Sequence, residues 1–341
     1  MSTDTMQAMV LEKTGEGAGL VMRHVPCKQP GPGQAQVSLH AAALNRRDVW
    51  IRLGRYAGIQ LPAILGSDGA GIVSAVGEGV GKEWLGQAVV INPSIGFGPS
   101  EDAQGANYRI LGMPDDGTYA ESIVVPAANL AKKPAHLSFV EAAALPLAGL
   151  TAYRALCVRG QLRPGQTVLI PGIGSGVSTM ALLFAQHLGA RVIVTSGSPD
   201  KLAAAAERGA SFGVSYRDAD WEEQIAKYLG GAHVDVVVDG AGAEAWSKSL
   251  NLLRPGGRIV SYGATAGLCQ IDLRKVFWKQ LNILGTTMGS ERDFAEMMAL
   301  VEAGKLRPCV DGVLPLREAM QAHQRMEQGQ QMGKLVLQIR D

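Results

Sequence analysis

Residues 164–201 constrain the fold more than any other stretch of the chain, and their sequence is PGQTVLIPGIGSGVSTMALLFAQHLGARVIVTSGSPDK. Thr167–Ile170 is β-branched and apolar, which is typical of a strand buried on both faces. Gly172, Gly174 and Gly176 follow directly. Because glycine has no Cβ, such a turn bends sharply and brings backbone N–H groups to an anion at the positive end of the next helix.

A helix is predicted over residues 177–188, ended by Gly189, and residues 191–195 are predicted to form a second strand. The predicted inward row of the helix is Val177, Ala181, Phe184 and Leu188. Valine stands at 177, where a Gly-x-Gly-x-x-Gly motif would have its third glycine. The turn by itself therefore fits two interpretations, a pyrophosphate site or a purely structural Gly-rich turn.

Two further segments favour the first interpretation. Val234–Asp239 (VDVVVD) and Gly257–Gly263 (GRIVSYG) have the pattern of buried parallel strands, and each ends in small residues. Ligands bind at the carboxyl ends of strands in doubly wound sheets. This half of the chain is therefore predicted to be an α/β, doubly wound parallel sheet that binds a nucleotide cofactor.

The N-terminal third has a different pattern. Residues 6–126 are rich in short alternating strands and glycine turns, such as Gln36–Ala43 and Gly69–Val76, which predicts an antiparallel, partly barrel-like domain. Helices alternate with strands from Leu137, and Asp220 and Glu223 predict a capping box. Residues 282–288 are a predicted last sheet strand. After two amphipathic helices, the strand Lys334–Ile339 is expected to return to the first domain.

Composition excludes several classes of function. The chain has 341 residues, with 32 Lys and Arg against 31 Asp and Glu, a balance that does not indicate nucleic acid or an acidic membrane surface as a partner. Four scattered cysteines without CxxC spacing fit neither a zinc knuckle nor a disulfide framework, and they suggest a cytoplasmic location. We expect no signal peptide and no membrane span.

The sequence resembles the medium-chain dehydrogenase/reductase superfamily, and within it the zinc-free quinone oxidoreductase branch that includes zeta-crystallin. The motifs that carry this resemblance are AAALNRRDVWIRLGRY (41–56), LGSDGAGIVSAVGEGV (65–80), DGTYAESIVVP (116–126), EAAALPLAGLTAYRAL (141–156), VDVVVDGAG (234–242), LRPGGRIVSYGATAG (253–267), FWKQLNILGTTMGS (277–290) and GKLVLQI (333–339). The resemblance implies a GroES-like β-rich catalytic domain over residues 1–132 and 290–341, with a Rossmann domain over 133–289.

The positions that match the catalytic zinc ligands of metal-dependent relatives carry Asn45, Ser67 and Leu147. None of these is a good zinc ligand, so no metal is expected. Relatives also carry a four-cysteine zinc lobe where this chain has NPSIGFGPSEDAQGANYRILG (92–112), without any cysteine. The Gly, Ser, Asn and Asp content of this lobe predicts a mobile loop.

Without a zinc Lewis acid, a conjugated acceptor is the expected substrate, since its negative charge spreads as hydride arrives. The resemblance implies an NADPH-dependent quinone or enone reductase. Tyr56 matches a tyrosine of the family's substrate cleft and is the expected donor to the developing oxyanion; alternatively it only packs on a loop. Asn45 and Asp48 would shape the same wall, although Asp48 could equally pair with Arg47 or Arg52. The cluster Arg46, Arg47, Arg52 and Arg55 could attract an anionic substrate or cofactor, but it is interpreted as a solvated helix face.

Cofactor choice is predicted at the end of the second strand. Enzymes that use NAD usually place Asp or Glu there, and that carboxylate repels a 2′-phosphate. Here Ser196, Gly197 and Ser198 precede the first acidic residue, Asp200, with Lys201 one turn on and Tyr216-Arg217 after the third strand. This set resembles the family's NADPH pocket; alternatively Lys201 only faces solvent. Further cofactor residues implied by the resemblance are Thr151, Gly172, Gly174, Ser175, Gly176, Val177, Gly240, Ala241, Gly263, Ala264 and Lys334.

Ser178 replaces a glycine of the family's turn, so the helix is expected to start slightly farther out. Two other functions stay open at this point: a metal-using alcohol dehydrogenase, and a crystallin-like NADPH-binding protein without turnover. Residues 282–288 match the family's dimerisation strand, so a homodimer is expected.

Overall fold

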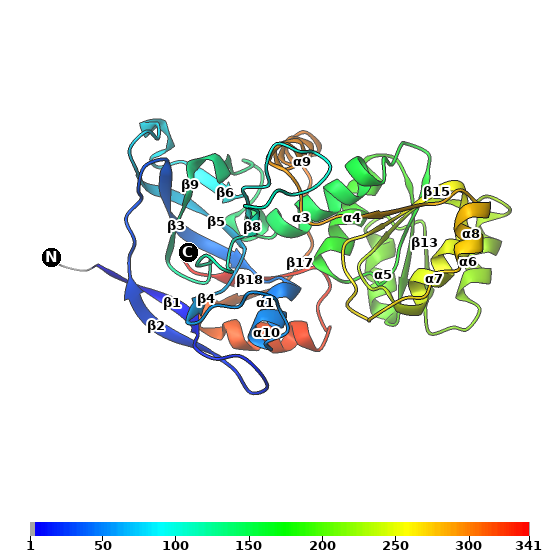
Figure 1. Cartoon of the computed structure of the whole chain (residues 1–341), viewed down its shortest axis with the longest axis horizontal. Coiled ribbons are helices and arrows are strands. Elements are labelled where there is room, and N and C mark those ends of the chain that lie inside the picture. Colours follow the sequence, from blue (N-terminus) through cyan, green and yellow to red (C-terminus); the bar gives the residue numbers. More distant parts are fainter. Residues whose placement is uncertain (1–3, 341) are drawn as a thin grey trace. The chain divides into compact units, whose positions relative to one another are not determined.

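The computed structural model describes residues 4–340 and divides into two compact units (Figure 1). Unit 1 combines the chain up to residue 148 with the chain from residue 289, and unit 2 spans residues 149–288. The predicted second boundary, 289/290, agrees to within one residue. The predicted first boundary, 132/133, was too early, because helix α2 (Phe139–Ala143) packs on strands β3, β5 and β18 of unit 1.

Unit 2 contains a parallel sheet with the strand order β13-β12-β11-β14-β15-β16. In chain order this is 3-2-1-4-5-6, the order of a doubly wound dinucleotide-binding sheet, which confirms the predicted fold class. The strands are β11 (Thr167–Ile170), β12 (Arg191–Ser196), β13 (Phe212–Ser215), β14 (Val234–Asp239), β15 (Leu253–Ser261) and β16 (Asn282–Gly285).

Helices cover this sheet because its central strands are apolar on both faces. Leu169, Ile193 and Val237 of adjacent strands share one buried cluster with Trp221 of α6 and Trp246 of α7. Burying side chains of this size stabilises the unit by roughly 1.5–3 kcal/mol each. The helices are α3 (Pro146–Tyr153), which continues as a π-helical segment (Arg154–Arg159), α4 (Gly176–His187), α5 (Pro199–Glu207), α6 (Trp221–Leu229), α7 (Ala243–Leu252) and α8 (Leu273–Trp278).

Unit 1 is built around strand β3 (Gln34–Ala43), which pairs with β5 (Asp68–Val76), β9 (Ser122–Pro126) and β18 (Lys334–Gln338). The antiparallel register Leu337↔Ala42 confirms that the end of the chain returns to the first domain. The other strands are β1 (Thr5–Leu11), β2 (Leu20–Pro26), β4 (Ala63–Ile64), β6 (Ala88–Ile91), β7 (Ser94–Ile95), β8 (Arg109–Ile110), β10 (Leu130–Lys132) and β17 (Val310–Pro315).

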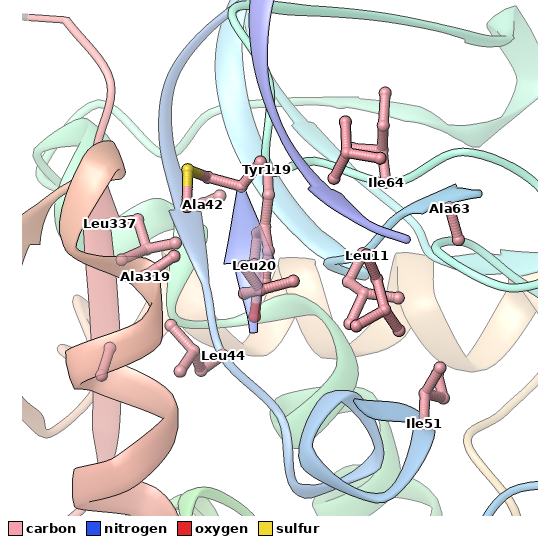
Figure 2. Close-up of a cluster of buried hydrophobic side chains, with 14 of the residues drawn as sticks. Leu11, Leu20, Ala42, Leu44, Ile51, Ala63, Ile64, Tyr119, Ala319 and Leu337 are labelled. Atoms are coloured by element: carbon pink, nitrogen blue, oxygen red, sulfur yellow. The ribbon is translucent and has the colours of Figure 1, made fainter. Parts of the chain in front are cut away.

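The core of unit 1 fixes helix α1 (Arg46–Arg52) against the strands. Figure 2 shows Ile51 of this helix in the same cluster as Leu11, Leu44 and Tyr119. Two helices late in the chain, α9 (Glu291–Gly304) and α10 (Ala319–Glu327), complete the unit, and Ala319 enters the cluster. The core therefore holds the first turn of α1, which carries several polar candidates, in a fixed place.

Some local predictions were wrong. Asp220 is the N-cap of α6 but makes no capping hydrogen bond, because its Oδ1 accepts instead from Gln224 Nε2 at 2.8 Å. Strand β16 ends at Gly285, three residues short of the predicted Met288. Val177 and Leu188 are only partly buried, whereas Ala181 and Phe184 are fully buried.

No helix within residues 4–340 is long and apolar enough to cross a membrane. Within the described residues no disulfide joins any of the cysteines Cys27, Cys157, Cys269 and Cys309.

Candidate functional site

The glycine turn of unit 2 lies between β11 and α4, where the strand order of the sheet reverses. Gly172 and Gly174 have φ angles of 67° and 133°, a conformation that favours glycine. Ser175 is the N-cap of α4, with Gly176 and Val177 as the first helical residues. The first N–H groups of a helix have no intrahelical partner and attract anions. The turn can therefore bind a pyrophosphate.

Ser178 does not behave simply as a larger substitute for glycine. The helix starts at Gly176, and the buried Ser178 side chain folds back into the turn. Its Oγ accepts from the Gly174 N–H at 3.1 Å and lies 2.9 Å from Ser175 Oγ. One N–H group of the turn is thus already used inside the protein.

The residues predicted to select the cofactor come together at the end of β12. Ser196 Oγ accepts from the Ser198 N–H at 3.1 Å, and Ser198 caps α5. The Lys201 side chain reaches back over the turn: a Cβ added at Gly174 would lie 3.0 Å from Lys201 Nζ. A Cβ added at Gly197 would lie 2.7 Å from Tyr216 Oη and 2.8 Å from Arg217 Nε. Tyr216 and Arg217 therefore lie beside the end of β12, which carries no carboxylate, and Lys201 lies over the glycine turn that follows β11.

The ends of β14 and β15 also lie close together. Asp239 accepts from the N–H groups of Ala241, at 3.0 Å, and Gly242, at 2.8 Å. Burial nevertheless raises the pKa of Asp239 above its ordinary value. A Cβ added at Gly263 would lie 3.1 Å from the Gly240 carbonyl oxygen, so the two strand ends are in close contact here. Ala264 accepts from Gly267 N–H.

Tyr262 was missed by sequence reasoning, although it directly follows β15. Its ring lies on Gly240, where an added Cβ would be 2.2 Å from the ring. Its hydroxyl is hydrogen-bonded to the Ser175 side chain, and burial raises its pKa. Tyr262 therefore joins the ends of β14 and β15 to the glycine turn. The remaining candidate, Thr151, lies on α3 and is buried.

In unit 1, Asn45 and Asp48 form a capping pair at the start of α1. The Asn45 N–H donates to Asp48 Oδ2 at 2.8 Å, and Tyr119 Oη donates to the same oxygen at 2.9 Å. Burial raises the pKa of Asp48. The alternative, an ion pair of Asp48 with Arg47 or Arg52, does not form; Arg52 pairs with Glu327 at 2.5 Å.

Asn45 is also fixed from the other side by a buried ion pair. Lys334 Nζ donates at 2.7 Å to each of Asp68 Oδ2, Asn45 Oδ1 and the Leu44 carbonyl. An ammonium group has three protons, so all of them have acceptors within unit 1. The ammonium group therefore positions Asn45 and Asp68. The assignment of Lys334 to the cofactor cleft stays a prediction from the resemblance.

The three positions equivalent to zinc ligands are occupied in other ways. Asn45 also donates its amide N–H to Asp68 Oδ2 at 2.9 Å, so both ends of the amide are engaged. Ser67 Oγ accepts from Arg47, and Leu147 offers only an aliphatic side chain. Within residues 4–340, no group of three or more His, Cys, Asp or Glu side chains could hold a metal ion. These residues do not fit a catalytic zinc ion.

Tyr56 follows α1 and is partly buried. The Arg47 Cζ atom lies 5.1 Å from the centre of its ring. The interpretation of the arginine cluster as a solvated face was wrong for two members, because Arg47 is 9% exposed and Arg52 is 3% exposed. Sequence reasoning missed these burials because the acceptors lie far away in the chain.

The lobe over residues 92–112 keeps an ordered base without cysteines. Strands β7 and β8 pair antiparallel, with Ser94 opposite Ile110. The rings of Phe97 and Tyr108 meet edge to face at 5.6 Å between centroids. Apolar packing and a short antiparallel strand pair therefore hold the two ends of this lobe together at its base.

Comparison with known proteins agrees with both units. Residues 31–135 match the alcohol dehydrogenase GroES-like domain, and residues 176–303 match the zinc-binding dehydrogenase domain. The zinc-type alcohol dehydrogenase-like protein YogA of Leptosphaeria maculans is 35% identical over 91% of this chain and 92% of its own length.

Two solved structures are also similar. A crystal structure titled NAD-dependent alcohol dehydrogenase has a TM-score of 0.92 and 42% identity, covering 98% of this chain and 100% of that chain. The 2-octenoyl-CoA carboxylase reductase CinF, in complex with NADP and 2-octenoyl-CoA, has a TM-score of 0.88 and 26% identity, covering 98% of this chain and 88% of that chain.

Proposed function

This chain belongs to the medium-chain dehydrogenase/reductase superfamily of oxidoreductases, and on that premise we propose that it is an NADPH-dependent reductase of quinones or α,β-unsaturated carbonyls that works without catalytic zinc. The proposal rests mainly on the residues at the three positions that match zinc ligands in metal-dependent relatives. Asn45 is held by Lys334 and Asp68, Ser67 is held by Arg47, and Leu147 has no ligand atom in its side chain. A Lewis acid is therefore not part of the proposed chemistry.

The proposal of NADPH rests on the end of β12. Lys201, Tyr216 and Arg217 offer positive charge and a hydroxyl around Gly174 and Gly197, without a carboxylate to repel a 2′-phosphate. The glycine turn and the first turn of α4 would bind the pyrophosphate. When bound, NADPH supplies the hydride. The CinF complex with NADP supports this choice, whereas the NAD-dependent relative makes the selectivity a point to measure.

The protein's own part in the proposed reaction is to orient the acceptor and to stabilise its developing negative charge. Tyr56 is the proposed hydrogen-bond donor to the acceptor oxygen, because its hydroxyl lies beside the guanidinium of Arg47. Asn45 and Asp48 are fixed by several hydrogen bonds each, so their proposed role is to shape the wall beside Tyr56.

The test is an oxidation screen with NADPH and NADH over quinones, enones and simple aldehydes. We expect NADPH oxidation with at least one conjugated acceptor and much slower turnover with NADH. Absence of oxidation over a broad panel would contradict the proposal. If NADPH still binds tightly in that case, the result would favour a protein that binds NADPH without turnover.

The name of the relative YogA supports a second candidate, a zinc-using alcohol dehydrogenase. Elemental analysis separates the two candidates, because this function requires about one zinc ion per chain together with oxidation of simple alcohols.

A homodimer through unit 2 is also part of the proposal. Strand β16 forms the edge of the sheet, and α8, which directly precedes it, exposes Leu273, Phe277 and Trp278 at 70%, 68% and 83%. A soluble protein rarely leaves so much aromatic and aliphatic surface uncovered, so a second copy of this chain is the proposed partner. Light scattering on the eluted protein should give twice the chain mass of 35.9 kDa, and a monomer would refute the dimer.

A further inference from the structure

Arg47 links three separate segments of unit 1 through one guanidinium group. Its Nη1 donates to Ser67 Oγ at 2.7 Å and to the Leu111 carbonyl at 2.9 Å, and its Nη2 lies 3.4 Å from the Met113 carbonyl. One of these acceptors, Leu111, belongs to the end of the cysteine-free lobe, and Met113 directly follows that lobe. The planar fork of a guanidinium is rigid, so these contacts fix its position and orientation.

The fixed guanidinium lies against Tyr56. Its Nε donates over a long distance, 3.4 Å, to Tyr56 Oη, and its Cζ lies 5.1 Å from the ring centroid. A guanidinium group has donors only, so the Tyr56 oxygen must be the acceptor in this contact. The phenolic proton of Tyr56 is therefore left to be donated in another direction, as an oxyanion donor requires.

The positive charge of Arg47 is also balanced less directly than that of Arg52 on the same helix. Arg52 has an ion-pair partner in Glu327, whereas no carboxylate within residues 4–340 lies at ion-pair distance from Arg47. Asp48 interacts with Arg47 through space, but its Oδ2 already accepts from Asn45 and Tyr119. A fixed cation thus stands beside Ser67, at one of the positions where metal-dependent relatives have a zinc ligand.

We propose that Arg47 is a positioning residue that holds Tyr56 as a hydrogen-bond donor and supplies fixed positive charge beside it. This inference rests on the proposed function. Ser67 has no exposed surface, so its part is to anchor Arg47 and not to contact substrate. Arg47 acts on the acceptor only through Tyr56, whose ring it orients and whose O–H group its charge makes a stronger donor.

The experiment is a double-mutant cycle on the full-length protein with Arg47→Met, Tyr56→Phe and the combined variant. Each single substitution should lower kcat roughly 10- to 100-fold with a smaller change in KM, since the donor acts mainly in the transition state. The combined variant should lie within about threefold of Tyr56→Phe alone, because residues that act as a unit are not additive. NADPH affinity should stay at the wild-type value in all three.

Two further variants separate positioning from folding. Arg55→Met is the matched control, because Arg55 lies over the Trp50 ring, at 5.9 Å, as Arg47 lies over Tyr56, but is exposed; it should keep wild-type kcat. Arg47→Lys keeps the charge without the fork, so it should recover part of the activity and replaces Arg47→Met if that variant does not fold. Wild-type turnover in Arg47→Met or Arg47→Lys, or losses that multiply in the combined variant, would overturn the proposal.

Binding of 4-nitrophenolate, followed by its absorbance, gives a readout without turnover. Equal weakening in Arg47→Met and Tyr56→Phe, with no further weakening in the combined variant, supports the positioning role even if the wild-type protein reduces no acceptor and the proposed function fails. Binding that is lost in Tyr56→Phe but unchanged in Arg47→Met overturns the positioning role and leaves the proposed function standing.

Discussion

The strand ends of unit 2 and the polar network around Asn45 in unit 1 are built in opposite ways. In unit 2 the site is made by backbone shape and by side chains at the surface, such as Tyr216, which is 47% exposed. In unit 1 the site is made by side chains that bind one another inside the protein. Lys334 is 2% exposed there, and Asp68 is not exposed at all.

This difference determines whether a substitution changes cofactor affinity or the stability of the fold. A surface cation beside an empty phosphate site lowers the stability of the folded protein very little, because water solvates its charge. Removing one partner of a buried ion pair strongly destabilises the folded protein, since the other charge stays buried without water or a counter-ion. We therefore expect substitutions at the end of β12 to change cofactor binding, and substitutions around Asn45 to change folding first.

The largest expected effect concerns pH and His323 in unit 1. Both ring nitrogens lack a hydrogen-bond partner, and burial, with Arg52 nearby, lowers the His323 pKa to about 3. The unfolded chain would bind this proton near pH 6.5, so stability should fall as pH decreases from about 6.5 towards 3, by up to about 5 kcal/mol. Urea unfolding at a series of pH values measures this loss.

The control for that prediction is His323→Leu. It removes the proton and two unsatisfied nitrogens, so the variant should be at least as stable as wild type above pH 7 and should show a shallower loss in acid. An unchanged pH dependence in His323→Leu would show that other groups cause the acid lability.

Breaking the buried ion pair should come next in size. Lys334→Met leaves the Asp68 carboxylate buried without its cation, and should lower the free energy of unfolding by roughly 3–5 kcal/mol. Adding Asp68→Asn to this variant should restore part of the loss, because the unpaired charge disappears. Urea unfolding of both variants tests this, and a Lys334→Met protein as stable as wild type would break the contrast between the two units.

At the end of β12 the expected change is in binding and not in folding. Lys201→Ala should weaken NADPH binding about 10- to 100-fold, the value of a charge-assisted hydrogen bond, and should leave NADH binding and the unfolding midpoint unchanged. Lys227→Ala, on the neighbouring helix α6, is the matched control. Equal losses for NADPH and NADH would mean that Lys201 does not recognise the 2′-phosphate.

The smallest expected effect is at Ser178. In the wild type, Gly174 N–H donates to Ser178 Oγ. Ser178→Ala removes this acceptor, so the N–H group can donate to the pyrophosphate. Cofactor affinity should rise a few-fold, as one neutral hydrogen bond allows, while stability falls by about 1 kcal/mol. Fluorescence titration with NADPH measures the first change, and weaker binding would argue against a phosphate at this turn.

The same contrast explains how much could be predicted from the sequence. Strands β11 and β14 were predicted with the bounds that the structure has, because unbroken apolar runs are typical of central parallel strands. Ser196, Gly197, Lys201 and Tyr216 were grouped by their resemblance to the family's NADPH pocket, and they follow strands whose carboxyl ends meet at one edge of the sheet. Local patterns gave these strands, and the resemblance gave the residues at their ends.

The network of unit 1 could not be predicted in this way. Asp68 and Lys334 are 266 residues apart in the chain, and no spacing rule joins them. Arg47 was misinterpreted as solvated because its acceptors include the backbone carbonyls of Leu111 and Met113, far away in the chain. Tyr119 and His323 were missed for a similar reason, since they meet only when α10 packs on the strands.

The central claim is hydride transfer to a conjugated acceptor without metal, and one measurement tests it most directly. Protein dialysed against a strong chelator is assayed for NADPH oxidation with the best acceptor of the screen, and its zinc content is measured on the same sample. The account predicts full activity with zinc far below one ion per chain. Activity that disappears with the chelator and returns in proportion to added zinc would contradict it.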